Sequence, residues 1–489
     1  MQHESDKSDL TFPTNLIAFV FGIGLFYHSL FIRSENFLQD PDTYWHIETG
    51  QWIWLQQKFP RSDIFSHTAF GQPWTDMEWL AQVILYFSYE ALGWHGVVLL
   101  ASLTLTLTFV TMYVLLAQNL RATVALGATT VAYIFASNHF LARPHLLSYP
   151  VIVLWAALLA RACDENRRPS YWLLPLVTLW ANLHGGFTFG MVLTAGFAFE
   201  STVTASVADR RRVATEWSVF WICALLAGCI TPYGYQYIVE TYNVLNLGLV
   251  LQQNSEWRPM NADNEFAHEL ILLLLLTLAL SYGVKIRFPR TLLLVGILHL
   301  GLKHVRALPM IGLTWPFLLA RPLQTQCAFL RPSIDPWPLF GARTSGPLPA
   351  LLCAAATAIA MVVLSAVYIQ VRQPTPSPNV SPQAAVDYVL AQNVTGPVLN
   401  DFDFGGYLIF RGIKTFIDGR TLPFGKKFAV EYFEAMSPEK LSKLDEMADT
   451  YKVTWTLLRP GTPMANYFDH SPRWRQLYND KIAVVHVRR

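Results

Sequence analysis

The chain has 489 residues, of which 53% are hydrophobic and 14% are charged, and its mean hydropathy is +0.30. Soluble domains carry about 25% charged residues, so this composition excludes a soluble enzyme, a fibre and a disordered chain and indicates a polytopic membrane protein. The net charge of +2 gives no reason to expect a nucleic-acid partner. Charge is concentrated at one end, because 27 of the 119 residues from 371 to 489 are charged, against 43 of the 370 before them.

Apolar segments follow one another along the first 370 residues, and we expect most of them to cross a membrane. Lys and Arg gather in four connections that are separated by two segments each, so all four connections can be cytoplasmic at once. The clusters are Arg161, Arg167 and Arg168; Arg210 to Arg212; Lys285, Arg287 and Arg290; and Arg321, Arg331 and Arg343. The approximate bounds of the apolar segments are 15–32, 78–92, 94–117, 121–138, 146–163, 170–183, 187–206, 215–230, 266–284, 290–303, 306–320 and 347–370.

The segment 78–92 differs from the others because polar residues, including Glu78 and Glu90, interrupt it. We predict that it lies at the membrane surface or is half inserted, which also satisfies the charge pattern. The result is an all-α polytopic membrane protein with about eleven transmembrane helices over residues 1–370, its amino terminus inside and its carboxyl terminus outside.

The carboxyl-terminal part is predicted to form a separate unit. Residues 371–383 are rich in Pro and Ser and form a linker. Over 384–489 we expect a small α/β domain on the outward, periplasmic side. Its predicted strands are 397–400, 414–418, 452–458 and 481–487, and its predicted helices are 428–436 and 438–451.

The first outward loop, 33–77, mixes carboxylates with tryptophans and predicts amphipathic helices at the membrane interface. Asp40-Pro41-Asp42 lies within ten residues of the outer end of the first span, and Pro41 disfavours helix at Asp40, so the two carboxylates are expected on a short turn. Such a pair can hold a divalent cation such as Mg²⁺ or Mn²⁺, or one member can act as a base. A capped, solvated turn is the alternative.

Cationic residues stand at the outward ends of several spans, against the usual bias, and each of them needs a partner. An anionic head group is one candidate, because Arg binds phosphate oxygens bidentately. An internal ion pair, for example Arg258 with Glu256, is the alternative. The residues concerned are Arg143, Arg258, Lys303, His304 and Arg306.

Further polar residues at outward corners are expected to take part in substrate binding, namely His46, His184, Tyr233, Glu256, Asp418 and Arg420. His184 suits a ligand or a proton carrier, although a lone His at a helix end is more often a cap. Asp418 and Arg420 could contact a substrate or form an ordinary turn with a solvated charge pair. The sequence contains no nucleotide-binding motif of the Walker A or Gly-rich strand–helix kind.

The order of these features resembles the GT-C superfamily of membrane glycosyltransferases, and several short motifs are similar to those of bacterial GT-C-like proteins. These motifs are DPDTYWHIETG, FSHTAFGQPW followed by EWL, NLHGG, TPYG, EWRP, KHVRALP, and GGYLIF followed by FIDGR. The chain lacks the Pro-Pro-Leu-like and Trp-Trp-Asp-like signatures of well-known members.

The resemblance implies a sugar transferase of a bacterial inner membrane that uses a polyprenyl-phosphate-linked donor on the periplasmic face. It implies that Asp40 or Asp42 serves as the base or metal ligand. It also implies that Arg143, Arg258, Lys303 and Arg306 hold the lipid phosphate. The acceptor, whether glycan, lipid or protein, stays open. The alternatives are an O-antigen-type polymerase or ligase, a transporter of lipid-linked glycans, and a non-catalytic scaffold of the same fold.

Overall fold

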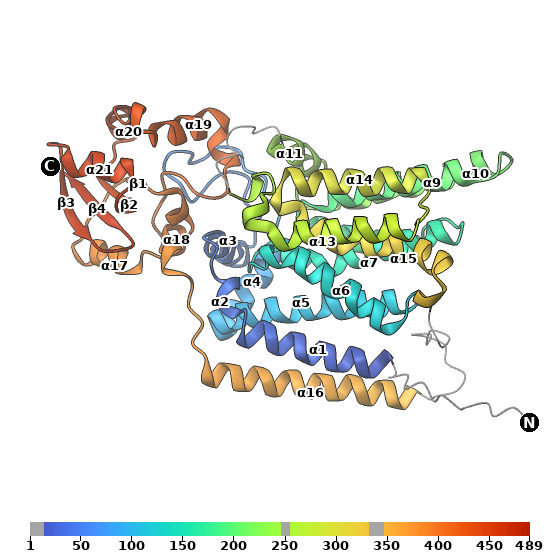
Figure 1. The fold of residues 1–489 in the computed structure, drawn as a ribbon. Helices are drawn as coiled ribbons and strands as arrows, with labels where there is room; N and C mark the ends of the chain where they lie inside the picture. Colours follow the sequence, from blue (N-terminus) through green and yellow to red (C-terminus); the bar gives the residue numbers. More distant parts are fainter. Residues whose placement is uncertain (1–13, 246–254, 332–346) are drawn as a thin grey trace, which may run out of the picture.

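Helices that run side by side fill most of the molecule, and a small sheet lies beyond one end of them (Figure 1). The computed structural model describes residues 14–245, 255–331 and 347–489, so Arg343 of the fourth cationic cluster lies outside the described residues. The expected apolar segments coincide with helices whose ends differ by a few residues. The helices before residue 372 are α1 (Thr14–Phe31), α2 (Ser34–Phe37), α3 (Asp42–Gln56), α4 (Trp79–Leu92), α5 (Trp94–Ala117), α6 (Ala122–Ala136), α7 (Pro144–Asp164), α8 (Leu174–Leu183), α9 (Phe187–Thr204), α10 (Arg210–Gly228), α11 (Gln236–Leu245), α13 (Ala262–Ser281), α14 (Phe288–Lys303), α15 (Leu308–Gln326) and α16 (Pro347–Val371).

Within the described residues, four helices are long and apolar enough to cross a membrane: α5, α7, α13 and the Cys353–Val371 part of α16. The apolar windows of α5 and α7 are 61% and 72% buried, whereas those of α13 and α16 are 11% and 6% buried. Thus α5 and α7 form the interior of the bundle, and α13 and α16 turn their apolar side chains outward. The other described helices are too short or not apolar enough to count as spans in this way, so the count of eleven spans stays a prediction.

Helix α4, which corresponds to the segment 78–92, lies beside α2 and α3 at the end of the bundle that faces the sheet (Figure 1). It has 14 residues, about 21 Å at 1.5 Å per residue, against a hydrocarbon core of about 30 Å. Gly93, with φ of 59°, separates it from α5. A straight helix of this length does not cross the hydrocarbon core, and the position of α4 at the membrane surface stays a prediction.

Proline stands at the start of three helices, of which α7 and α15 lead away from this end of the bundle and α14 leads towards it. Pro144, Pro289 and Pro309 stand in the first turn of α7, α14 and α15, where the backbone leaves N–H groups unpaired in any case. At α7 the preceding residue, Arg143, has an extended backbone with φ −128° and ψ 162°. Its side chain therefore leaves the helix and reaches the α2–α3 turn.

The residues after 371 form a four-stranded sheet with helices packed on it, in the strand order β1-β2-β4-β3. β1 and β2 are parallel, and the other two pairings are antiparallel. The strands are β1 (Val398–Asn400), β2 (Trp455–Leu458), β3 (Trp474–Asn479) and β4 (Val484–Arg488). The helices are α17 (Gln383–Ala391), α18 (Gly405–Phe410), α19 (Gly425–Ala435), α20 (Lys443–Thr450) and α21 (Pro463–His470).

Three of the four expected strands are confirmed, but the strand expected at 414–418 is wrong. Thr415 there pairs with Ser66 of the α3–α4 loop instead of with the sheet. The side chain of Asn400 accepts from the Phe416 N–H at 2.8 Å and donates to the Ile417 carbonyl at 2.9 Å. The backbone of this segment is thus satisfied without a strand partner. β3 was not expected, because its side chains are mostly polar and exposed.

The α3–α4 loop and the carboxyl-terminal part are joined by a buried ion network. Both carboxylate oxygens of Asp418 bind the Arg420 guanidinium at 2.7 Å, and Asp63 of the loop binds its third nitrogen. The side chains of Asp63, Asp418 and Arg420 are fully buried. Because an unpaired buried charge is costly, this network fixes the loop against the carboxyl-terminal part.

We expect Asp63→Asn to destabilise the protein by about 3–5 kcal/mol, because it removes one partner of a buried charge cluster. Thermal unfolding of the detergent-solubilised protein, followed together with limited proteolysis of the α3–α4 loop, measures this. The matched control is Asp387→Asn, whose partner Arg411 lies at 2.8 Å on the surface and whose loss costs under about 1 kcal/mol. Equal melting temperatures for Asp63→Asn and wild type would contradict a role of the network in holding the junction.

Candidate functional site

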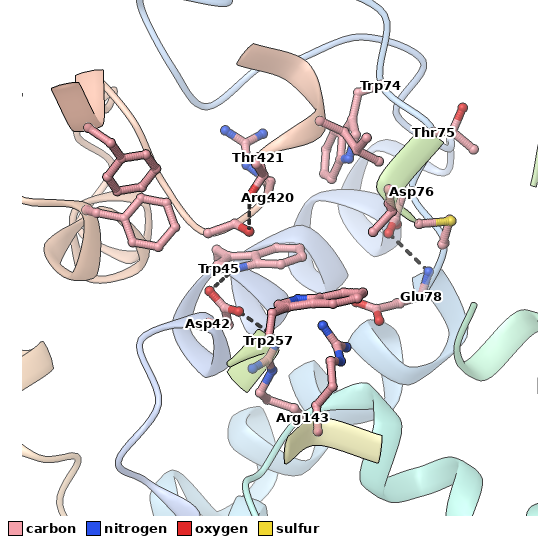
Figure 2. Close-up of a pocket in the computed structure, with 17 residues that line it drawn as sticks. Asp42, Trp45, Trp74, Thr75, Asp76, Glu78, Arg143, Trp257, Arg420 and Thr421 are labelled. Carbon is pink, nitrogen blue, oxygen red and sulfur yellow. Dashed lines mark hydrogen bonds and ion pairs between the residues drawn. The ribbon is translucent and has the colours of Figure 1, made fainter. Parts of the chain in front are cut away.

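A cavity of about 160 Å³ lies where the end of the helix bundle meets the carboxyl-terminal part. Its charged lining is mixed, with acidic and basic side chains facing one space between aromatic walls. Figure 2 shows Asp42 and Arg143 together on one side and Asp76 and Glu78 on the other, with the indole rings of Trp45 and Trp257 between them. The charged lining residues are Asp42, Asp76, Glu78, Arg143, Arg306 and Arg420, and the aromatic ones are Trp45, Trp74, Trp257, Phe402 and Phe433.

Arg143 is the residue on which most of these contacts converge. Its Nη1 lies 3.2 Å from Asp40 Oδ2 and 2.7 Å from Glu256 Oε1, and its Nη2 lies 2.9 Å from Asp42 Oδ2. The carboxylates come from two distant segments, the α2–α3 turn and the short 3₁₀ turn Ser255–Trp257. A planar guanidinium with several fixed donors can serve three acceptors at once, which a compact ammonium group does less well.

The carboxylates around Arg143 do not ionise alike. Burial raises the pKa of Asp40 to about 7, although Arg143 works against this. Burial also raises the pKa of Asp42, against the attraction of Arg143 and the Trp45 hydrogen bond. For Glu256 burial opposes ionisation too, but Arg143 and Arg306 together hold its pKa well below the usual range. Glu256 is therefore the firmest anionic partner of the two arginines.

The carboxylate pair that could have held Mg²⁺ or Mn²⁺ does not present itself as a cation site. Asp40 and Asp42 both turn their Oδ2 atoms to Arg143. Among residues 14–245, 255–331 and 347–489, no three His, Cys, Asp or Glu side chains are arranged to hold a metal ion. In this arrangement the residues do not fit a resident divalent ion, and the guanidinium supplies the positive charge between the carboxylates.

On the other side of the cavity, Glu78 lies between two histidines. Its Oε2 is 3.6 Å from His46 Nε2, and its Oε1 is 3.4 Å from His184 Nε2. Burial raises the pKa of Glu78 to about 8. Neighbouring Asp76 accepts from the Gln82 amide at 2.8 Å, and burial raises its pKa to about 7.

Arg306 reaches the cavity from the turn between α14 and α15, supported by an aromatic ring. Its guanidinium lies 4.5 Å from the centre of the Trp257 ring, and its Nη1 lies 3.9 Å from Glu256 Oε2. His304 faces the Trp257 carbonyl at 2.9 Å and packs edge-on against the same indole. Arg306 has a 30% exposed side chain, twice the 15% of Arg143, and so offers the more accessible cation.

Most residues proposed from the sequence come together here. Asp42, Arg143, Arg306 and Arg420 line the cavity. A second group contacts these residues or Glu78 and Trp257 from behind: Asp40, His46, His184, Glu256, His304 and Asp418.

The other three proposed residues, Arg258, Lys303 and Tyr233, belong to neither of these two groups. Arg258 pairs with Glu265 at 2.5 and 3.0 Å, so an internal ion pair exists, with a different partner from the one weighed in the sequence. Lys303 is the exposed last residue of α14. The hydroxyl of Tyr233 donates to the Pro60 carbonyl at 2.8 Å, which anchors the α3–α4 loop.

Sequence reasoning missed Asp76 and Glu78 as site residues. Glu78 stands at the boundary of an apolar segment and was assigned to a surface helix. A signal was present, because Asp76-Met77-Glu78 repeats the acidic spacing of Asp40-Pro41-Asp42 at the far end of the same loop. Trp74 and Trp257, which pack against arginines, were also not singled out.

The sequence matches no family model and no curated protein. Solved structures do match. The apo oligosaccharyltransferase of Archaeoglobus fulgidus superposes with a TM-score of 0.50 at 12% identity, over 91% of this chain and 69% of that one. The same enzyme tethered to an acceptor peptide with an NVT sequon gives 0.50 at 11% identity, over 91% and 68%. Its complex, as AglB, with an inhibitory peptide and a dolichol-phosphate gives 0.50 at 11%, over 91% and 69%.

The chain has the GT-C fold. The resemblance seen in the short motifs is thereby confirmed at the level of fold. Within a GT-C frame, the cavity lies at the junction of the helical part and the carboxyl-terminal part, and the first outward loop supplies one of its walls.

We expect Arg143→Ala to bind Mn²⁺ that the wild type does not bind, because the change leaves Asp40, Asp42 and Glu256 without their common cation. Electron paramagnetic resonance of Mn²⁺ titrated into the detergent-solubilised proteins measures free and bound ion. Wild-type binding that Asp42→Asn abolishes would contradict the interpretation that the guanidinium takes the place of a metal.

We expect Glu78 to be protonated at neutral pH, because burial raises its pKa to about 8. Infrared difference spectra of wild type and Glu78→Gln should show a protonated carboxyl band at pH 7 that is absent in the variant. The band should disappear as the pH rises through about 8, since the group ionises above its pKa. A Glu78 band that is already absent at pH 6 would contradict this.

Proposed function

We propose that this protein is a GT-C membrane glycosyltransferase that transfers a sugar from a polyprenyl-phosphate-linked donor to an acceptor. The observation that supports this most directly is the cavity in which Arg143 and Arg306 face a set of buried carboxylates at one end of the apolar bundle. Cations suited to a phosphate and carboxylates suited to proton transfer are the two groups that such a reaction needs at one place.

Arg306 and Arg143 would bind the phosphate of the donor. Arg306 is the accessible one, and its contact with Glu256 at 3.9 Å is long, so an incoming phosphate oxygen can compete for it. Arg143 is already oriented by Asp40, Asp42 and Glu256 and needs no rearrangement to stabilise charge on the leaving group. Trp257, under Arg306, holds that guanidinium in its place.

In the proposed reaction the acceptor oxygen attacks the anomeric carbon from the side opposite the phosphate, so the configuration inverts. The bond from the anomeric carbon to the phosphate oxygen breaks, and the polyprenyl phosphate leaves with both electrons of that bond. Asp42, at the cavity wall beside Arg143, contributes by fixing that guanidinium. The archaeal enzyme of the same fold has been solved in complex with a dolichol-phosphate, which supports a donor linked to a lipid phosphate.

We further propose a division of the chain into a membrane part over 1–370, a linker over 371–383 and a periplasmic part over 384–489 in a bacterial inner membrane. Two observations support this. The α9–α10 and α13–α14 connections, which carry two of the cationic clusters, lie at the end of the bundle away from the sheet (Figure 1). The cavity lies at the opposite end, next to the carboxyl-terminal part.

The test is sugar release by the purified protein from a panel of radiolabelled synthetic polyprenyl-phosphate sugars, compared with Arg306→Ala and Asp42→Asn. Removal of one charge-assisted phosphate contact costs about 1.5–3 kcal/mol, so Arg306→Ala should bind the donor about 10-fold to 100-fold more weakly. Asp42→Asn should lower release by leaving Arg143 less firmly held. The control is Arg210→Ala, which changes an exposed arginine at the far end of the bundle.

Release by wild type with the expected losses supports the transferase. Donor binding without release, unaffected by Asp42→Asn, would favour a carrier or scaffold and overturn the proposal. Extension of a glycan chain that stays on its lipid carrier would instead indicate a polymerase.

A further inference from the structure

We propose that Glu78 is the group that accepts the proton of the incoming nucleophile, and that His46 and His184 position it. The proposal rests on the proposed function and names a catalytic residue for it. Glu78 lines the cavity, whereas its two histidine partners stand behind it in α3 and at the end of α8.

The carboxylates of the first acidic pair are already engaged. Asp42 Oδ2 binds Arg143 at 2.9 Å, and its Oδ1 accepts from the Trp45 indole N–H at 2.9 Å. The backbone of Gly419 covers the same oxygen so closely that an added Cβ would lie 1.9 Å from it. Asp40 Oδ1 accepts a hydrogen bond from the Asp42 N–H at 2.8 Å, and Asp40 Oδ2 pairs with Arg143. A proton placed on either group would neutralise a carboxylate that pairs with Arg143 and so weaken that pair.

Glu78 has a different environment. Among the described residues, its ion contacts are with two histidines, at 3.6 and 3.4 Å. The backbone N–H of Gly186 donates to His184 Nδ1 at 3.0 Å, so a neutral His184 carries its proton on Nε2, which faces Glu78. His46 offers its Nδ1 to the Gln82 amide at 3.4 Å, which leaves its Nε2–H toward the other oxygen of Glu78.

Two N–H groups therefore face the two oxygens of one carboxyl group, at distances longer than a full hydrogen bond. The buried Nε2 of His46 has no hydrogen-bond partner within the described structure. A small shift of Glu78 toward the cavity or back toward the histidines changes its hydrogen bonding without breaking an arginine pair. The side chain is 22% exposed and thus reachable from the cavity.

The ionisation of the surroundings supports this role. Burial raises the pKa of Glu78 to about 8, close to the pH at which a base is most useful. The charged and titratable groups that face it are His46, His184, Asp76, Asp42, Arg143 and Arg306. Burial, and then the arginines, hold the pKa of His184 down to about 3, so it stays neutral and acts as a donor.

The proposed step forms one bond, breaks one bond and transfers one proton. The acceptor oxygen forms a bond to the anomeric carbon while the bond to the phosphate oxygen breaks. The proton of the acceptor hydroxyl, or of water in the absence of an acceptor, moves to a Glu78 carboxylate oxygen. The leaving phosphate keeps the electron pair and stays against Arg143 and Arg306. The proton returns to solvent through the cavity after the sugar has left.

The experiment measures sugar release to water from a radiolabelled polyprenyl-phosphate sugar, together with donor binding, for wild type, Glu78→Gln and Glu78→Asp. We expect Glu78→Gln to lower the release rate about 100-fold with donor binding unchanged, since a positioned base contributes about 10²–10⁴. Glu78→Asp keeps the carboxylate and should recover part of the rate. The control is Glu90→Gln, at the exposed far end of the same helix.

A pH profile separates catalysis from a structural role. In the wild type the rate should rise tenfold per pH unit and level off near pH 8, because the base must lose its proton first. Glu78→Gln should lose this inflection, and His184→Ala should move it to higher pH, because a donor to the carboxylate is gone. The melting temperature of each variant shows whether it is folded. If Glu78→Gln is not folded, the release rate and pH profile of Glu78→Asp test the role of Glu78 instead.

The outcomes are distinct. Wild-type release with an unchanged rate and inflection in folded Glu78→Gln would overturn the role of Glu78 and leave the transferase standing. Loss of release in Asp42→Asn but not in Glu78→Gln would return the base to the first acidic pair. A wild type that neither binds nor releases any donor would overturn both proposals.

Discussion

The site depends on one guanidinium. Arg143 stands at the start of α7, held there by the following proline, and connects the first outward loop to a turn more than a hundred residues further along the chain. Without Arg143 the three carboxylates would repel one another, and burial would raise their pKa values so that they become protonated. With it they form a neutralised wall, and the accessible Arg306 remains beside them to meet an anion.

Around this wall the cavity separates two electrostatic tasks. The side that contains Arg143, Arg306 and Glu256 favours charge on a phosphate. On the side that contains Glu78 and Asp76, burial raises the pKa of Glu78 to about 8 and that of Asp76 to about 7, whereas the two arginines hold the pKa of Glu256 well below its usual range. Trp45 and Trp257 stand between the two sides (Figure 2). Groups with separated proton affinities in one small space are the usual requirement for acid–base chemistry.

The sequence predicts much of this because membrane insertion imposes strong patterns. Apolar segments locate the helices, and the distribution of Lys and Arg places Asp42, Arg143, Arg306 and Arg420 at one end of the bundle, where they meet. The sequence does not predict which residues form ion pairs or backbone pairings with one another. Arg258 turned to Glu265 rather than into the cavity, and Thr415 paired with a loop rather than a sheet. Both outcomes depend on the relative placement of segments distant in sequence, and Glu78 was hidden because it adjoins an apolar run.

The buried network of Asp63, Asp418 and Arg420 also bears on how substrates reach the cavity. To lift the carboxyl-terminal part away would separate Arg420 from Asp63 of the α3–α4 loop and break a buried ion pair, while Asp418 would move together with Arg420. The carboxyl-terminal part is therefore a fixed wall of the cavity and does not open. Under the function proposed above, donor and acceptor therefore have to reach the cavity while this junction stays closed.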